Sequence, residues 1–144
     1  MTRPPMILLV EDDPNDVFMA TLAFETTGVD LELTIAAHGG DALAYLQRSG
    51  PYTHRPAGFP NLILLDLNMP QMNGFELLRA MKQDGVLSRI PVVILTTSTS
   101  ERDRETCTAL GADGFLVKPQ EFHGLLTLIG DLTTRWLPTA RLAM

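Results

Sequence analysis

Cysteine and long apolar runs are both scarce in this sequence, and each shortage excludes a class of protein. The single cysteine, Cys107, cannot form an internal disulfide. The first residues lack the apolar core of a signal peptide, and no apolar run approaches the roughly 20 residues that a membrane-spanning helix needs. Together these absences predict a cytoplasmic protein without a membrane partner.

An excess of basic residues is also missing. Lys and Arg number 11 against 17 Asp and Glu, which gives a formal charge of −6. A nucleic-acid-binding surface would show clustered Lys and Arg, so the composition argues against nucleic acid and favours protein or small-ion partners. The length of 144 residues is that of one ordinary domain, large enough to bury a core without disulfides or metal.

Short apolar runs alternate with helix-like segments along the chain. Five of these runs fit strands, over residues 6–10, 31–37, 61–65, 91–95 and 115–117. A segment with helical spacing or a helix-start signal follows each run. Five such units imply a parallel sheet with helices on both faces, because each crossover is right-handed and returns to the same end. We therefore predict an α/β fold, a doubly wound (βα)5 domain.

Local signals place the helix starts and the main loop. Asp13 before Pro14 predicts a helix start, because Asp accepts from first-turn amides and Pro loses nothing at the first helical position. Ser98 and Glu101 have the spacing of a capping box and predict the start of the fourth helix. Residues 50–60, with three prolines, predict a long surface loop without regular structure.

The rest of the chain is organised around residues 61–74, NLILLDLNMPQMNG. This stretch predicts a buried strand that carries Asp66 to its carboxyl end. In an open parallel sheet, ligands bind outside the carboxyl ends of the strands. We expect the residues that end the other strands to meet Asp66 at this edge, namely Glu11, Asp12, Thr96 and Lys118.

These side chains point to phosphoryl chemistry. Three carboxylates packed together repel one another unless a cation joins them, and hard oxygen ligands suit Mg²⁺. Asp66 can attack phosphorus and form an aspartyl phosphate. Thr96 can donate a hydrogen bond to one phosphoryl oxygen, and Lys118 can pair with another.

Four stretches in this order, LLVEDDP, LLDLNMPQMNG, PVVILTTS and GADGFLVKP, resemble the receiver domains of two-component response regulators. The resemblance implies a flavodoxin-like strand order, 2-1-3-4-5, and a receiver domain over residues 6–135. It also implies that a partner histidine kinase phosphorylates the domain in a Mg²⁺-dependent reaction. The receiver would then switch the surface of its fourth helix, fifth strand and fifth helix.

Carried over by resemblance, the metal and phosphate positions fall on four residues. Asp66 matches the phosphoacceptor, and Asp12 matches the acid that ligates Mg²⁺ directly. Glu11 would act largely through water, and the backbone carbonyl of Asn68 would be the third protein ligand. Asp13 then falls outside the metal site.

The resemblance also implies the switch residues. Thr96 matches the switch hydroxyl, Lys118 the phosphate-contacting lysine, and Pro119 the proline that is usually cis in the family. The aromatic switch position is Phe115, where many receivers have Tyr. Because Phe has no hydroxyl to bond outward in the active state, this chain departs from the family pattern there.

A narrower likeness is to the single-domain regulators that serve bacterial phytochromes. It rests on PNLILLDLNMP, on the Pro-rich loop, on IPVVILTTS and on a tail with Trp136, Leu137 and Pro138. It implies a bacteriophytochrome as the kinase and a homodimer, in which residues 136–144 form a C-terminal dimer arm through Trp136 and Leu137. The alternative is that Trp136 covers the core of its own chain.

Three other interpretations stay open. A phosphatase with an aspartyl nucleophile, as in haloacid dehalogenase-like enzymes, needs a second acid two residues after the nucleophile, where this chain has Asn68. A receiver that is never phosphorylated would only mediate protein contacts. The hydroxyl run 96–100 also fits a flavin mononucleotide loop, as in flavodoxins, although capping explains it better. We therefore predict a phosphoacceptor that catalyses no more than its own phosphorylation and dephosphorylation.

Overall fold

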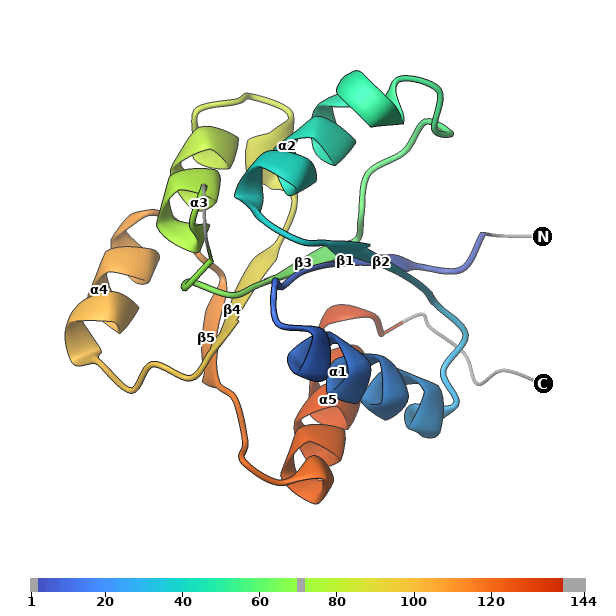
Figure 1. Cartoon of the computed structure of the whole chain (residues 1–144), viewed down its shortest axis with the longest axis vertical. Helices are drawn as coiled ribbons and strands as arrows, with labels where there is room; N and C mark the ends of the chain where they lie inside the picture. The colour runs from blue at the N-terminus through green and yellow to red at the C-terminus, as the bar shows by residue number, and fades with distance from the viewer. Residues whose placement is uncertain (1–2, 70–71, 139–144) are drawn as a thin grey trace.

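Five short strands form one parallel sheet in the order β2-β1-β3-β4-β5 (Figure 1). The structure is a computed structural model that describes residues 3–69 and 72–138. The strands are β1 (Met6–Val10), β2 (Glu32–Ala36), β3 (Leu62–Leu65), β4 (Val92–Thr96) and β5 (Gly114–Val117). The predicted α/β class and strand order are confirmed.

Helices cover both faces of the sheet. They are α1 (Pro14–Thr27), α2 (Gly39–Gln47), α3 (Gly74–Lys82), α4 (Glu101–Ala109) and α5 (Phe122–Trp136), with a short 3-10 turn at η2 (Leu87–Arg89). Helices α1 and α5 pack on one face, and α2, α3 and α4 lie on the other (Figure 1). Among the described residues, no helix has the length and apolar character needed to cross a lipid bilayer.

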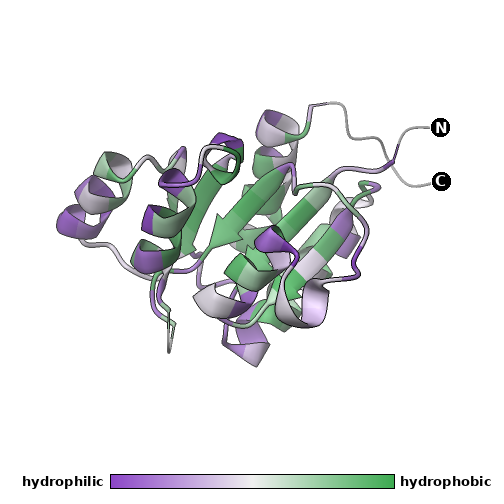
Figure 2. Ribbon diagram, turned by 90° about the horizontal axis from the view of Figure 1, so that it is seen from above, coloured by the Kyte–Doolittle hydropathy of each residue, from purple (hydrophilic) through white to green (hydrophobic). Residues whose placement is uncertain are grey.

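The core has two parts, one on each side of the sheet. Leu8 and Ile63 face α2 and α3, whereas Ile7 and Leu64 face α1 and α5. Every residue of β1, β3 and β4 is buried, and these strands are the continuous apolar centre of Figure 2. A strand covered on both faces needs apolar residues at every position, so the short apolar runs were a reliable strand signal.

The predicted start of α1 is confirmed. The Asp13 carboxylate accepts hydrogen bonds from the backbone N–H groups of Asn15, at 2.8 Å, and Asp16, at 3.4 Å. Pro14 occupies the first helical position, where its missing N–H costs no hydrogen bond. The cap therefore fixes how the first turn of α1 leaves the end of β1.

The predicted cap of α4 is wrong by two residues. Ser100 is the cap, and its hydroxyl accepts a hydrogen bond from the Asp103 N–H at 3.2 Å. The Ser98 hydroxyl donates instead to the Asp103 carboxylate at 2.6 Å. Any hydroxyl in the run 96–100 can cap a helix, so the register depended on where β4 ends.

The loop after α2 contains one turn of 3-10 helix, η1 (Gly50–Tyr52), which corrects the expectation of no regular structure. Arg55 holds the loop against α2. Its Nε donates a hydrogen bond to the carbonyl of Tyr45 at 2.7 Å, and its guanidinium carbon lies 4.1 Å from the centroid of the Tyr45 ring. The Tyr52 hydroxyl donates to Asp41 at 2.7 Å. That hydrogen bond, with burial, raises the pKa of Tyr52 to about 12.

Gly74, the first residue of α3, packs directly against the backbone that carries Asp66. A Cβ at this position would lie 2.4 Å from the carbonyl oxygen of Asp66 and 2.8 Å from the Cα of Leu67. Because backbone atoms cannot move aside alone, we expect Gly74→Ala to lower the free energy of unfolding by about 1–3 kcal/mol. Urea unfolding followed by circular dichroism measures this change.

Gly130 in α5 provides a matched control. Among the described residues, no atom outside the neighbouring helix backbone lies within 4 Å of a Cβ added there, and glycine inside a helix costs roughly 0.5–1 kcal/mol relative to alanine. Gly130→Ala should therefore raise the free energy of unfolding. Equal unfolding midpoints for Gly74→Ala and the wild type would contradict the close approach of α3 to the Asp66 backbone.

Candidate functional site

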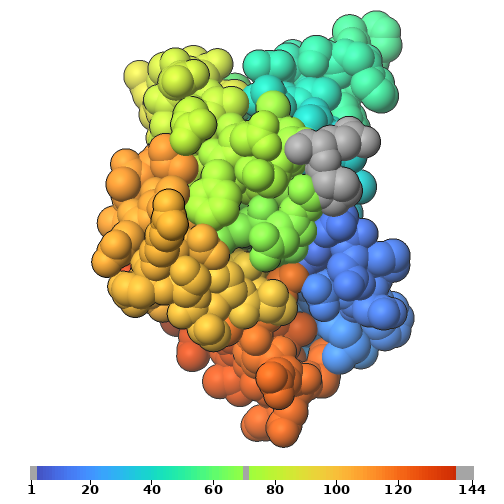
Figure 3. Space-filling model, turned by 60° about the vertical axis from the view of Figure 1, so that its left-hand side comes forward, coloured from blue at the N-terminus to red at the C-terminus, as the bar shows by residue number. Residues whose placement is uncertain are grey.

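Three carboxylates meet where β1 and β3 end. Glu11 and Asp12 follow β1, Asp66 follows β3, and one oxygen of each lies within 4.8 Å of the others. The parallel register pairs Val10 with Leu65, the two residues that precede Glu11 and Asp66. The segments that follow β1, β3, β4 and β5 come together on one face of the molecule (Figure 3). The structure thus brings the predicted acids together by strand register.

Burial makes this cluster electrostatically unfavourable on its own. Glu11 is 3% exposed and Asp66 is 7% exposed, whereas Asp12 is exposed at the rim. Burial raises the pKa of Glu11 to about 7, and it also raises the pKa of Asp66 above its usual range. Both shifts reflect the cost of holding desolvated carboxylates charged.

The donor set fits a hard divalent cation. Mg²⁺ prefers oxygen ligands and is often held by one or two carboxylates while keeping several waters. Asp12 and Asp66 would bind it directly, and Glu11 would act through water. Asn68 lies in the loop two residues after Asp66, and the role of its carbonyl as third ligand stays a prediction. When bound, the cation neutralises the carboxylates and polarises phosphoryl oxygens.

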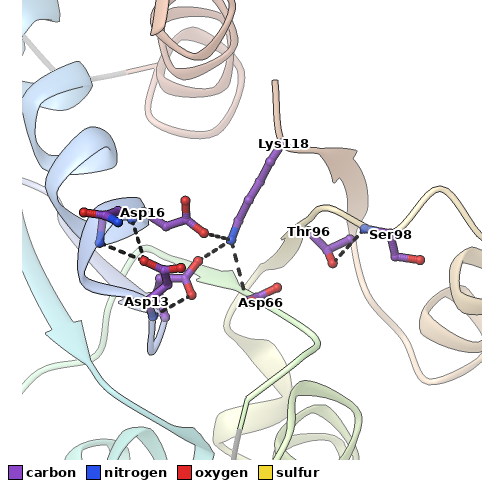
Figure 4. A network of polar contacts seen from close by, with 8 residues as sticks. Asp13, Asp16, Asp66, Thr96, Ser98 and Lys118 are labelled. Atoms are coloured by element: carbon purple, nitrogen blue, oxygen red, sulfur yellow. Dashed lines mark hydrogen bonds and ion pairs between the residues drawn. The ribbon is translucent and has the colours of Figure 1, made fainter. Parts of the chain in front are cut away.

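Lys118 reaches the cluster from the end of β5. Its Nζ donates hydrogen bonds to Glu11 and to Asp16 Oδ2, the latter at 2.9 Å, and lies 3.7 Å from Asp66 Oδ2 (Figure 4). Burial alone would lower the pKa of Lys118, but the hydrogen bonds to Glu11 and Asp16 outweigh it and raise that pKa. Lys118 is therefore a charged ammonium among three carboxylates.

Asp16 is a site residue that the sequence interpretation missed. It lies in the first turn of α1, and its side chain is 41% exposed. The interpretation considered only residues that end strands, whereas Asp16 reaches the site from a helix. A signal was present, since Asp16 follows the helix cap Asp13 by three residues and α1 begins at the same sheet edge.

Thr96 lies at the same edge but outside the acidic network. The residue is fully buried, and its hydroxyl oxygen accepts a hydrogen bond from the Ser98 N–H at 3.2 Å. None of the contacts drawn in Figure 4 joins Thr96 to Asp66. The switch role of Thr96 therefore stays a prediction that requires its hydroxyl to move.

Phe115 lies on β5 opposite Ile94 of β4 and is half-buried. The guanidinium carbon of Arg104, from α4, lies 4.8 Å from the centroid of its ring. A cation over an aromatic face is attracted by the ring quadrupole. Helix α4 thus touches the aromatic ring that would report the switch, although the switch role itself is a prediction.

The prediction of a cis peptide bond before Pro119 is wrong. No peptide bond is cis in residues 3–69 and 72–138, so the Lys118–Pro119 bond is trans. Trans is the more stable isomer of an X–Pro bond by about 0.5–1 kcal/mol. In this chain the trans bond is compatible with the contacts of Lys118 to the acidic cluster.

The predicted contribution of Leu137 to a dimer is also not supported. Leu137 is 4% exposed and packs with Ile129 and Leu132 in the core beneath α1 and α5. Trp136 ends α5 and packs partly against the same core. The alternative, in which Trp136 covers its own chain, is thus favoured. Residues 139–144 of the proposed arm lie outside the described residues.

A comparison with known protein families assigns this chain to a family. Residues 7–130 match the family described as response regulator receiver domain. The chain belongs to this family. Receivers are signalling domains that are phosphorylated on an aspartate and bind a divalent cation at their acidic cluster. The cluster Glu11, Asp12 and Asp66 therefore confirms the predicted Mg²⁺ cofactor.

Individual relatives agree with the family assignment. Response regulator Rcp1 of Synechocystis sp. is 40% identical over 139 residues, which cover 96% of this chain and 93% of Rcp1. Its Mn²⁺-bound crystal structure gives a TM-score of 0.85 and covers 98% of this chain and 100% of that one. The phosphorylated cyanobacterial phytochrome response regulator RcpA is 35% identical, with a TM-score of 0.88 and coverage of 99% and 100%.

A third similar structure is the bacteriophytochrome response regulator AtBRR. It is 40% identical, has a TM-score of 0.78, and the match covers 91% of this receiver and 94% of AtBRR. The predicted likeness to phytochrome-associated regulators is therefore confirmed as a likeness.

Asp12→Asn should weaken binding of Mg²⁺ by about tenfold or more, because loss of even an outer-shell partner commonly costs that much affinity. Titration calorimetry with Mg²⁺ measures the effect. Asp13→Asn is the matched control: it removes the same charge one residue away, and Asn caps helices as well as Asp does. Equal affinities of the two variants would contradict the assignment of Asp12 as a ligand.

Proposed function

We propose that this receiver accepts a phosphoryl group from a partner histidine kinase on Asp66. The observation that carries the proposal is the position of Asp66, within the carboxylate cluster and 3.7 Å from the Lys118 ammonium. Glu11 is engaged through both oxygens, by Lys118 and by the Asp13 N–H at 3.2 Å, and Asp12 is exposed at the rim. Asp66 is therefore the best-placed nucleophile.

The residues of this chain supply the groups that the transfer needs. A carboxylate oxygen of Asp66 attacks phosphorus, the P–N bond of the kinase phosphohistidine breaks, and its electron pair stays on the imidazole. The product on Asp66 is an acyl phosphate. Lys118 is close enough to exchange a carboxylate partner for a phosphoryl oxygen, which would stabilise the added charge.

The switch would act through α4, β5 and α5. Thr96 would turn its hydroxyl toward the phosphoryl group, and Phe115 would move inward, away from Arg104. Cys107 is the one residue of α4 that is buried, so few apolar contacts oppose a shift of this helix. We assign the receiver to residues 6–135 and a C-terminal extension to residues 136–144, of which Trp136 and Leu137 pack against the core of this chain.

The proposed kinase is a bacteriophytochrome, and the proposed setting is the cytoplasm. Support comes from the likeness to RcpA and AtBRR, whose names identify them as phytochrome and bacteriophytochrome regulators. The match spans nearly the full length of both proteins. We propose that the protein acts on no substrate beyond its own Asp66.

We also propose a homodimer built on β5 and α5. A groove of about 500 Å³ runs between these elements and is lined by apolar side chains that include Leu116, Leu128 and Trp136. β5 is an edge strand, and an exposed edge with an apolar lining favours pairing with another chain.

Incubation with Mg²⁺ and a small acyl phosphate should label Asp66, and Asp66→Asn should abolish the label. Intact-mass spectrometry detects the added phosphoryl group. Asp84→Asn is the control, because Asp84 is an acid in the loop after α3, outside the carboxylate cluster.

The same experiment separates the rival functions. Continuous release of phosphate, at a rate far above the rate at which labelled Asp66 loses its phosphoryl group, would indicate a phosphatase. No label on the wild type would indicate a receiver that only mediates protein contacts.

Sedimentation equilibrium should give a mass twice that of the 15.8 kDa chain. Leu128→Glu should shift the mass toward the monomer, because it places a charge in the apolar groove. Leu22→Glu, on the exposed surface of α1, should leave the mass unchanged. A monomer mass for the wild type, both with and without phosphorylation, would contradict the dimer.

A further inference from the structure

Asp16 contacts the reactive site without belonging to the carboxylate cluster. Its Oδ2 accepts a hydrogen bond from Lys118 Nζ at 2.9 Å (Figure 4). The cluster that can hold a cation consists of Glu11, Asp12 and Asp66. Asp16 also lies outside the roles that the family resemblance implies, so its contact with Lys118 needs an explanation of its own.

The other carboxylates around Lys118 have a second task. Glu11 and Asp66 belong to the cluster that would hold Mg²⁺, and Asp66 is the proposed nucleophile. Oxygens that turn toward a cation or a phosphorus atom are no longer free to orient the lysine. Asp16 is the one carboxylate among the contacts of Lys118 that keeps no other partner in the reaction.

The backbone of Asp16 lies in the first turn of α1, beside the helix cap. Its N–H donates to the helix cap Asp13 at 3.4 Å, and α1 packs along α5. Lys118 is the opposite case, since its flexible four-carbon stem loses rotamer freedom whenever the ammonium is fixed. A short side chain on an anchored helix is well suited to fix the end of a long one.

We propose that Asp16 is a positioning residue for phosphoryl transfer. It holds the Lys118 ammonium beside Asp66, so that of the three N–H donors of lysine one stays on Asp16 and the other two are free for the incoming phosphoryl oxygens. This inference rests on the proposed function of Asp66. Much of the entropic cost of ordering Lys118 is then met before the phosphodonor arrives.

A double-mutant cycle tests the proposal. The rate of Asp66 labelling by a small acyl phosphate at saturating Mg²⁺ is measured for the wild type, Asp16→Asn, Lys118→Ala and the double variant. Asp16→Asn should slow labelling about threefold, the size expected for a partly exposed ion pair. In the Lys118→Ala background the same change should have no further effect, and Asp16→Glu should restore part of the rate.

Glu121→Gln is the matched control. Glu121 lines the same cavity as Asp16 and Lys118. The ion pairs of Lys118 are with Glu11, Asp16 and Asp66, so this variant removes one charge from the site and leaves those ion pairs in place. It should label at the wild-type rate. An equal slowing by Glu121→Gln and Asp16→Asn would show a general charge effect and overturn the positioning role.

A second readout needs no phosphorylation. In metal-free protein, Asp16→Asn should lower the urea midpoint of unfolding in the wild-type background and leave it unchanged in the Lys118→Ala background. Additive effects in both measurements would overturn the proposal while leaving Asp66 as phosphoacceptor. Absence of any label on the wild type would overturn the proposed function, and the positioning role with it.

Discussion

The repulsion between carboxylates at one edge of the sheet is the constraint on which the site depends. Glu11 and Asp66 are buried and lie beside Asp12, an arrangement that costs free energy unless positive charge compensates it. Lys118 supplies part of that charge from the end of β5. The negative charge that Lys118 leaves uncompensated is the charge that a divalent cation at this edge would neutralise.

The sheet makes this crowding unavoidable. Parallel strands all end at the same edge, and the register that pairs Val10 with Leu65 fixes how closely their following residues approach. The strands that carry the acids are buried on both faces, so they cannot shift to relieve the repulsion. Rigidity at β1 and β3 contrasts with α4, which buries only Cys107 and therefore has few apolar contacts that oppose its displacement.

Lys118 connects these two regions. It follows β5, the strand that carries Phe115 beneath Arg104 of α4, and its ammonium is shared among acids from the ends of β1 and β3 and from α1. In the proposed positioning role, the same geometry gives the partly exposed Asp16 an influence on the reaction.

The sequence by itself determined the fold and the members of the acidic cluster, because apolar runs buried on both faces and acids at strand ends are local patterns. Tertiary structure decided the rest. Asp16 joins the site through a contact with a residue 102 positions away, and Leu137 turns into the core beneath α1 and α5. Ser100 rather than Ser98 caps α4. Each outcome depends on how separate elements pack, which no spacing along the chain records.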